Sequence, residues 1–216
     1  MGKKTSKGEW LRRQNKDQYV LTSRREGLRS RAAFKLEQIN KKYKILNSGY
    51  RVLDLGCAPG GWLSVARKYV GPTGKVVGVD LLDMDPIDGV DFIKGDFRDQ
   101  KIVEQIQERT EIQGLDLVIS DMAPNITGVS AIDLPAHYEL VDLALEFCLV
   151  QLSEGGHFII KLFQGSGFDS AVNDIRKFFK KVKLMKPDAS RKKSREVYLL
   201  GEYFRQQEIK SEGVLK

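Results

Sequence analysis

The segment Tyr50–Leu63, YRVLDLGCAPGGWL, joins a short apolar run to a glycine-rich turn and then to the start of a helical pattern. Residues 52–55 fit a buried parallel strand, because apolar side chains there would face both sides of a sheet. Gly56 and the pair Gly60-Gly61 permit a tight turn and let a ligand approach the backbone without meeting a Cβ atom. The segment therefore predicts a nucleotide-type binding site, although a strand, turn and helix with glycines for packing alone would have the same pattern.

The turn differs from two common phosphate-binding motifs. A dinucleotide fingerprint needs G-x-G-x-x-G, whereas this turn reads GCAPGG, and a P-loop would continue with Lys and Ser or Thr where Trp62 and Leu63 stand. Asp54, at the end of the strand, would repel a phosphate. It suits a ligand that carries positive charge, such as S-adenosylmethionine (SAM) with its sulfonium and α-amino groups.

Acidic residues also follow the next two predicted strands. Lys75–Asp80 ends in Asp80, at about the separation from the turn at which an acid binds ribose hydroxyls. Residues 90–93 lead to Asp96, which could accept a hydrogen bond from an adenine amino group while Phe97 packs beside the ring. One such acid could equally cap a helix. The series Asp54, Gly56, Asp80 and Asp96 at successive strand ends is a stronger signal, because open α/β sheets bind ligands there.

Composition predicts a single soluble domain. The chain has 216 residues, of which 41% are hydrophobic, and no apolar run approaches a membrane span or a signal-peptide core. Cys57 and Cys148 form no C-x-x-C pair, and only His137 and His157 could add imidazole ligands. We therefore expect no metal site, no disulfide scaffold and no membrane contact, but a cytoplasmic location.

The net charge of +7 is concentrated in two segments. Residues 1–31 carry ten basic and three acidic residues, and residues 176–195 carry ten and one, which leaves 16 of the 36 basic and 25 of the 29 acidic residues elsewhere. Two basic patches on an acidic body favour RNA as a partner, and Trp10, Tyr19 and Phe34 add possible stacking groups. A solvated tail and a solubilised helix end would explain the same charges.

The alternation of apolar runs and amphipathic segments predicts an α/β fold with a doubly wound, Rossmann-like sheet flanked by helices. A domain at 31–205 would lie between a basic RNA-binding segment at 1–30 and a tail at 206–216. Asp133 is expected to cap the helix that follows it, and Gly155-Gly156 to stop that helix. Strands are expected near 50–55, 75–80, 90–93, 115–120, 156–163, 182–185 and 196–204, and helices near 31–43, 61–70, 99–111, 134–152 and 168–179.

Two charged residues stand where a core would be apolar. Lys161 interrupts the run HFIIKLF, and Asp121 follows the run LDLVIS. Right-handed crossovers would bring the ends of these strands to one rim, so the two side chains are expected to face each other. A purely structural ion pair is the alternative.

Five motifs together resemble the RrmJ/FtsJ family of SAM-dependent ribosomal RNA 2'-O-methyltransferases, and the resemblance covers nearly the whole chain. The motifs are RSRAAFKL at 29–36, DLGCAPGGW at 54–62, DMAPN at 121–125, IKLF at 160–163 and SREVY at 194–198. The resemblance implies a catalytic tetrad of Lys35, Asp121, Lys161 and Glu196. It also implies cofactor contacts near the first turn, for which the candidates are Asp54, Gly56, Pro59, Gly60, Trp62, Asp80, Asp96, Phe97 and Asp121. The RNA-binding candidates are Arg29, Arg31, Lys35, Arg191, Arg195 and Tyr198.

Family members of this length modify a uridine in the aminoacyl-tRNA-binding loop of large-subunit rRNA. We therefore expect the partner to be large-subunit rRNA or the assembled large subunit, and the protein to be a monomer. Relatives modify tRNA or mRNA caps, so a tRNA 2'-O-methyltransferase is an alternative. A ribosome-assembly factor that binds RNA and SAM without needing catalysis is another, and an intact tetrad disfavours it.

The tetrad suits methyl transfer to a ribose hydroxyl. The hydroxyl is a weak nucleophile whose lone pair must lie in line with the methyl carbon, so most of the catalysis is expected from positioning. Lys161 is expected to bind and deprotonate it. Its amine must then be neutral, a state that the charge of Lys35 favours and that of Asp121 opposes. If Lys161 stays charged, it orients the hydroxyl, and Glu196 orients Lys35 or the ribose.

Overall fold

A computed structural model describes residues 29–110, 114–191 and 193–206. Most of the predicted RNA-binding segment, with Trp10 and Tyr19, lies outside the described residues, as does the tail beyond residue 206. The helices are α3 (Ala32–Tyr43), α4 (Gly61–Val70), α5 (Gln100–Arg109), α6 (Ser130–Gln151) and α7 (Phe168–Arg176). The strands are β1 (Arg51–Leu55), β2 (Lys75–Asp80), β3 (Asp91–Lys94), β4 (Leu115–Ser120), β5 (Leu152–Phe163), β6 (Phe179–Met185) and β7 (Glu196–Phe204).

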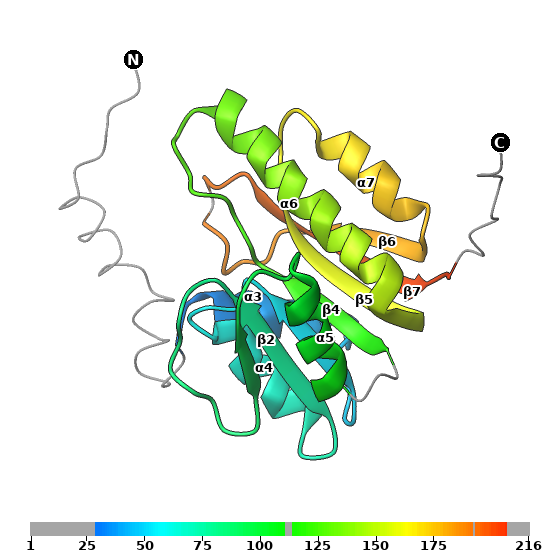
Figure 1. The fold of residues 1–216 in the computed structure, drawn as a ribbon. Helices are drawn as coiled ribbons and strands as arrows, with labels where there is room; N and C mark the ends of the chain where they lie inside the picture. The colour runs from blue at the N-terminus through cyan, green and yellow to red at the C-terminus, as the bar shows by residue number, and fades with distance from the viewer. Residues whose placement is uncertain (1–28, 111–113, 192, 207–216) are drawn as a thin grey trace, which may run out of the picture.

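The strands form one sheet in the order β3-β2-β1-β4-β5-β7-β6. The first five are parallel, whereas β7 runs antiparallel to both β5 and β6. Helices α3 and α4 cover one face, and α5, α6 and α7 cover the other (Figure 1). The predicted doubly wound, Rossmann-like sheet is confirmed.

Each face of the sheet has its own apolar core. In β1, Leu53 and Leu55 join the core under α5, α6 and α7, while Val52 joins the core under α3 and α4. This accounts for the continuous apolar run in the sequence, because a central parallel strand is buried on both faces. No helix within the described ranges is long and apolar enough to cross a membrane.

The strand register brings the chemically active residues to one rim of the sheet. Ser120, the last residue of β4, pairs with Ile160 of β5, so Asp121 and Lys161 are the next residues on neighbouring strands. Strand β7 enters the sheet from the same rim and pairs Tyr198 with Lys161 and Glu196 with Phe163. Residues far apart in the sequence thus meet at the carboxyl ends of β4 and β5.

Two predictions about α6 were wrong. The helix begins at Ser130 after Val129, and Asp133 lies inside its first turn, where its carboxylate accepts hydrogen bonds from Thr127 and Gly128 of the preceding loop. The helix ends at Gln151 and β5 begins immediately, so Gly155-Gly156 lie within that strand. The register of β4 and β5 shifts opposite them, between Leu115 and Leu117, and this irregularity is where the two glycines are accommodated.

Leu53 tests how far the central strand supports the fold, because its side chain is fully buried in β1. Leu53→Ala should lower the free energy of unfolding by about 2–5 kcal/mol, since it removes apolar contacts and leaves a cavity. Leu82→Ala, at a position that is 67% exposed, is the matched control and should change it by less than about 0.5 kcal/mol. Urea unfolding without added ligand measures both, and equal effects of the two changes would contradict this account.

Candidate active site

The turn after β1 needs glycine at the positions that the sequence singled out. Gly56 and Gly60 have φ of +73° and +94°, and a Cβ atom on Gly56 would lie 2.1 Å from Cγ of Met122. Asp80 braces this turn. One of its carboxylate oxygens accepts a hydrogen bond from the Ala58 N–H and the other from the Leu82 N–H, each at 2.8 Å. Gly60 then caps the start of α4.

Beside this turn lies a cavity of about 400 Å³ at the carboxyl ends of β1, β2, β3 and β4. Several predicted cofactor residues line it, namely Gly56, Asp80, Asp96, Phe97 and Asp121. Leu140 and Leu143 of α6, with Glu139 beside them, also line the cavity but were not predicted, because only the crossing of α6 over the sheet brings them here. Apolar walls with a few converging polar groups are typical of a small-molecule site.

Asp96 is already partnered in this cavity. Its carboxylate accepts hydrogen bonds from the backbone N–H and the guanidinium of Arg98, and these bonds lower the pKa of Asp96. An adenine amino group would have to share an oxygen with Arg98. The adenine contact of Asp96 therefore stays a prediction, and Arg98, two residues further along the chain, was not among the predicted site residues.

Asp54 lies in a second, smaller hollow of about 60 Å³ beside the turn, which Pro59, Trp62 and Asp121 also line. Its side chain is 1% exposed, and its Oδ2 atom has no hydrogen-bond partner among the described residues. Burial, together with the negative charges of Asp121 and Asp80, raises the pKa of Asp54 well above its ordinary value. A buried carboxyl with an unused oxygen is suited to a ligand that brings a positive charge or a donor.

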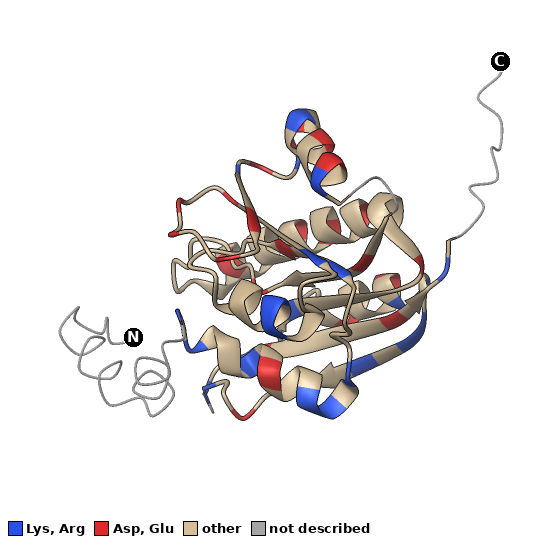
Figure 2. Cartoon of the chain, turned by 90° about the horizontal axis from the view of Figure 1, so that it is seen from below, with Lys and Arg blue, Asp and Glu red and all other residues tan. Residues whose placement is uncertain are grey.

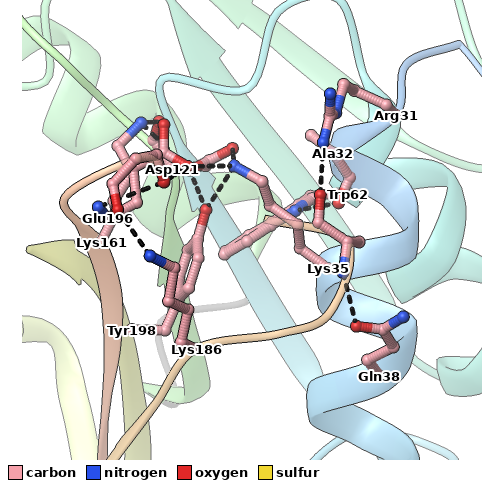
Figure 3. Close-up of polar contacts among 12 residues, drawn as sticks. Arg31, Ala32, Lys35, Gln38, Trp62, Asp121, Lys161, Lys186, Glu196 and Tyr198 are labelled. Atoms are coloured by element: carbon pink, nitrogen blue, oxygen red, sulfur yellow. Dashed lines mark hydrogen bonds and ion pairs between the residues drawn. The ribbon is translucent and has the colours of Figure 1, made fainter. Parts of the chain in front are cut away.

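Asp121 joins the two hollows to a group of charged side chains (Figure 3). The Lys161 ammonium donates to the backbone carbonyl of Asp121 at 2.5 Å and lies 3.1 Å from its carboxylate. Lys161 is 6% exposed, which is unusual for a lysine unless it is paired. The predicted approach of these two side chains is therefore present in the structure.

Lys35 of α3 reaches the same carboxylate from the other side. Its Nζ lies 3.6 Å from Asp121 Oδ2, 3.3 Å from Glu196 Oε2 and 2.8 Å from the hydroxyl of Tyr198. The Tyr198 hydroxyl in turn donates to Asp121 Oδ1 at 2.5 Å. All four residues of the expected tetrad thus meet, and Tyr198 stands at their centre.

The charges in this group decide which protonation states it favours. Burial tends to raise the pKa of Asp121, but the ammonium groups of Lys161 and Lys35 and the bond from Tyr198 outweigh it, so this pKa is lowered. Burial and the neighbouring Asp121 raise the pKa of Tyr198 well above its usual range. Asp121 is therefore an anion and Tyr198 a neutral donor at neutral pH.

The structure places the predicted RNA-binding residues in different settings. Tyr198 is 1% exposed and lies under the tetrad, so its ring offers no surface to RNA. The guanidinium of Arg29 donates to the carbonyls of Asp85 and Pro86, and that of Arg31 donates to the carbonyl of Ala189. Both arginines thereby fasten the start of α3 to loops around the site, and their RNA contacts stay predictions.

The second basic segment lies partly on the edge of the sheet. Lys180, Lys181 and Lys183 belong to β6, the outermost strand, where Figure 2 shows basic residues along the edge. Lys183 pairs with Glu202, and Lys181 lies over the ring of Tyr203. Trp62, a predicted cofactor residue, is buried and donates its indole N–H to the carbonyl of Ala32, so it joins α4 to α3.

Comparisons with known proteins agree with this geometry. The sequence profile described as FtsJ-like methyltransferase matches residues 28–204. The chain belongs to the FtsJ-like methyltransferase family. A Plasmodium falciparum protein assigned as a ribosomal RNA methyltransferase has a crystal structure that is similar to this FtsJ-like fold. The two sequences are 30% identical, the TM-score is 0.72, and the match covers 82% of this chain and 98% of that one.

The structure of Aeropyrum pernix fibrillarin, solved with natively bound SAM, is less similar to this FtsJ-like methyltransferase. It is 16% identical with a TM-score of 0.54, over 80% of this chain and 74% of that one, and it shows the fold alone. The predicted family, methyltransferase activity and SAM cofactor are confirmed. The residues fit this cofactor, because the unpaired Asp54 oxygen can receive an ammonium group and the larger cavity can hold a nucleoside.

Asp54 yields a test of how this methyltransferase holds SAM. The pKa of Asp54 is raised well above its ordinary value of 3.8. In the free protein the carboxyl therefore stays protonated at pH values at which an exposed aspartate would already be ionised. The ammonium group of SAM favours the ionised carboxylate, so binding should release a proton. At pH values between 3.8 and the raised pKa of Asp54, the affinity for SAM should therefore increase as the pH rises. Calorimetry in two buffers of different ionisation enthalpy measures that proton.

Asp54→Asn is the control for this linkage, because it keeps the shape of the side chain but cannot ionise. It should abolish the proton release and weaken SAM binding by roughly 10- to 100-fold, the range expected for a charged hydrogen bond. Identical binding enthalpies in both buffers at every pH would show that Asp54 does not face the ammonium group.

Proposed function

We propose that this FtsJ-like protein transfers the methyl group of SAM to a ribose 2'-hydroxyl of large-subunit rRNA, at a uridine of the aminoacyl-tRNA-binding loop. The observation that carries the proposal is the group formed by Lys35, Asp121, Lys161 and Glu196 beside the cofactor cavity. The structurally similar P. falciparum protein is assigned as a ribosomal RNA methyltransferase, and this similarity supports an RNA substrate. The basic residues on the described surface and in the sequence before it support the same class.

Lys161 is the residue that we place against the acceptor hydroxyl. When bound, SAM supplies an electrophilic methyl group. Two contacts to Asp121 fix the Lys161 ammonium, and a fixed donor or base can hold a hydroxyl in one orientation. As the new C–O bond forms, the hydroxyl must lose its proton, and Lys161 Nζ is the nitrogen that accepts it in the neutral state.

Lys35, Tyr198 and Glu196 act through these two residues. Lys35 brings a second positive charge to Asp121 and holds that carboxylate from the side opposite Lys161. The Tyr198 hydroxyl donates to Asp121 and accepts from Lys35, so it fixes the Asp121 carboxylate and the Lys35 ammonium relative to each other. Glu196 is bound to Lys35 and is more exposed than the other three tetrad members, which suits a residue that orients Lys35 or the ribose.

The proposal predicts which RNA accepts a labelled methyl group. Purified protein and methyl-labelled SAM are incubated with three substrates from cells that lack the protein: free large-subunit rRNA, assembled large subunits and tRNA. Mass spectrometry of nuclease digests should find one new 2'-O-methyluridine, in the aminoacyl-tRNA-binding loop. Label in tRNA alone would contradict the rRNA assignment and favour the tRNA alternative.

Lys161→Ala separates catalysis from binding in the same assay. The rate should fall on the order of 10²- to 10⁴-fold, because a positioned base is lost. SAM affinity should stay within about twofold, since other residues line the cofactor cavity. Lys101→Ala, an exposed lysine of α5, is the control and should match the parent. If Lys161→Ala methylates within a fewfold of the parent, Lys161 is only a structural ion-pair residue.

A further inference from the structure

A third hollow lies beside Glu196 of the tetrad, whereas the cofactor cavity lies beside Asp121. It has a volume of about 350 Å³ and lies between the loop before α6, the start of α6, the end of β5 and the start of β7. The residues that matter for its chemistry are Ile126, Leu134, Phe163, Ser194, Arg195 and Glu196. Its volume falls within the range of small-ligand sites, and the cofactor does not need it.

Different members of the tetrad line this hollow and the cofactor site. Asp121 lines both cofactor hollows, whereas Glu196 lines the third one. The Lys161 ammonium lies 5.8 Å from the centre of the Phe163 ring, which is another wall of the third hollow. A ribose held at Lys161 would therefore have the methyl donor on one side and this hollow on the other.

The walls of the hollow suit a flat ring with polar edges. Phe163, Leu134 and Ile126 supply apolar surface, while Ser194 and Arg195 supply donors. Ile126 is 57% exposed, so its side chain is accessible to a ligand at this wall. Unpaired RNA bases are recognised in this manner, by contact with apolar side chains on their faces and hydrogen bonds at their edges.

The ring of Phe163 is held in place from behind. The imidazole of His137 stacks on it, with 4.1 Å between ring centres, and the Tyr138 hydroxyl donates to the Phe163 carbonyl at 2.5 Å. Burial, and then the charge of Lys161, lowers the pKa of His137 to about 4, so this support is a neutral ring. The opposite wall is fixed by Asp133, whose carboxylate binds Thr127 and Gly128.

Arg195 lies at the mouth of the hollow. Its guanidinium donates to the hydroxyl of Ser130 at 2.9 Å, and no carboxylate within the described ranges pairs with it. A guanidinium bound only to a neutral hydroxyl can turn to a phosphate at little cost. The phosphate next to a base in the hollow would lie at this mouth.

We propose that this hollow binds the base of the nucleotide whose ribose is methylated, with Arg195 on an adjacent phosphate. This inference rests on the proposed function and assigns to the same site the pocket that selects the acceptor nucleotide. The base leaves its stack and inserts between Phe163 and Ile126, which brings its own ribose hydroxyl to Lys161. Extrusion of a base into such a pocket is a known way to present one nucleotide to an enzyme.

Ile126 and Ile132 provide a matched pair of substitutions. They are 57% and 56% exposed, lie six residues apart and differ in that Ile126 lines the hollow. With the RNA that the parent methylates, Ile126→Ala should raise KM about tenfold, because apolar contact with the base is lost. It should leave SAM affinity and the salt dependence of RNA binding unchanged, and Ile132→Ala should match the parent throughout.

Arg195→Ala tests the phosphate contact by a different measurement. The slope of log K for RNA against log salt should decrease by about one, since one phosphate contact is lost. Arg205→Ala, just beyond the other end of β7, should leave the slope unchanged. If the parent methylates no RNA, the proposed function fails. If the parent is active but Ile126→Ala equals Ile132→Ala, or Arg195→Ala keeps the full slope, the assignment of this hollow is wrong while the proposed function stands.

Discussion

The whole site depends on one carboxylate, that of Asp121, held between two lysine ammonium groups at the end of β4. Lys161 of β5 and Lys35 of α3 approach it from different sides, at 3.1 Å and 3.6 Å. Neither lysine would be stable in so buried a position without an anion, and removing one partner of such a group leaves a charge that is costly to bury. Glu196 pairs with Lys35 and supplies the second negative charge, so the two lysines and the two carboxylates have no net charge together.

The sheet makes this arrangement possible, because it brings the cofactor-binding turn and the charged residues of the tetrad to one rim. The glycine turn after β1 lets the backbone come close to a ligand, and Asp80 fixes its shape with two hydrogen bonds. Asp121 faces the cofactor hollows on one side, and Glu196 faces the third hollow on the other. Methyl donor and acceptor would thus meet across the tetrad, and most of the rate enhancement can come from their alignment.

Much of this was predictable from the sequence, and the exceptions have physical reasons. The glycine spacing, the acids at strand ends and Lys161 in an apolar run indicated the sheet, the cofactor rim and the ion pair. Tyr198 was expected at the RNA, because a tyrosine in a strand next to a basic loop gives no sign of the face to which it points. Asp133 looked like a helix cap, since a following proline usually marks the first turn, but the helix begins three residues earlier, at Ser130, and Asp133 binds the preceding loop from inside the first turn. The Asp96 and Arg98 pair is a local contact between residues two positions apart, which an Asp before a turn favours. The hollow beside Phe163, in contrast, depends on tertiary contacts that no local pattern records.

The most direct test of this account is the single-turnover methylation rate of Asp121→Asn at saturating SAM and RNA. Asparagine keeps the size of the side chain and one oxygen, but it removes the charge that holds both lysines. We expect the rate to fall on the order of 10²- to 10⁴-fold, comparable to the loss of a positioned catalytic group. A rate within about fivefold of the parent would show that the lysines are positioned without this carboxylate and would contradict the central claim.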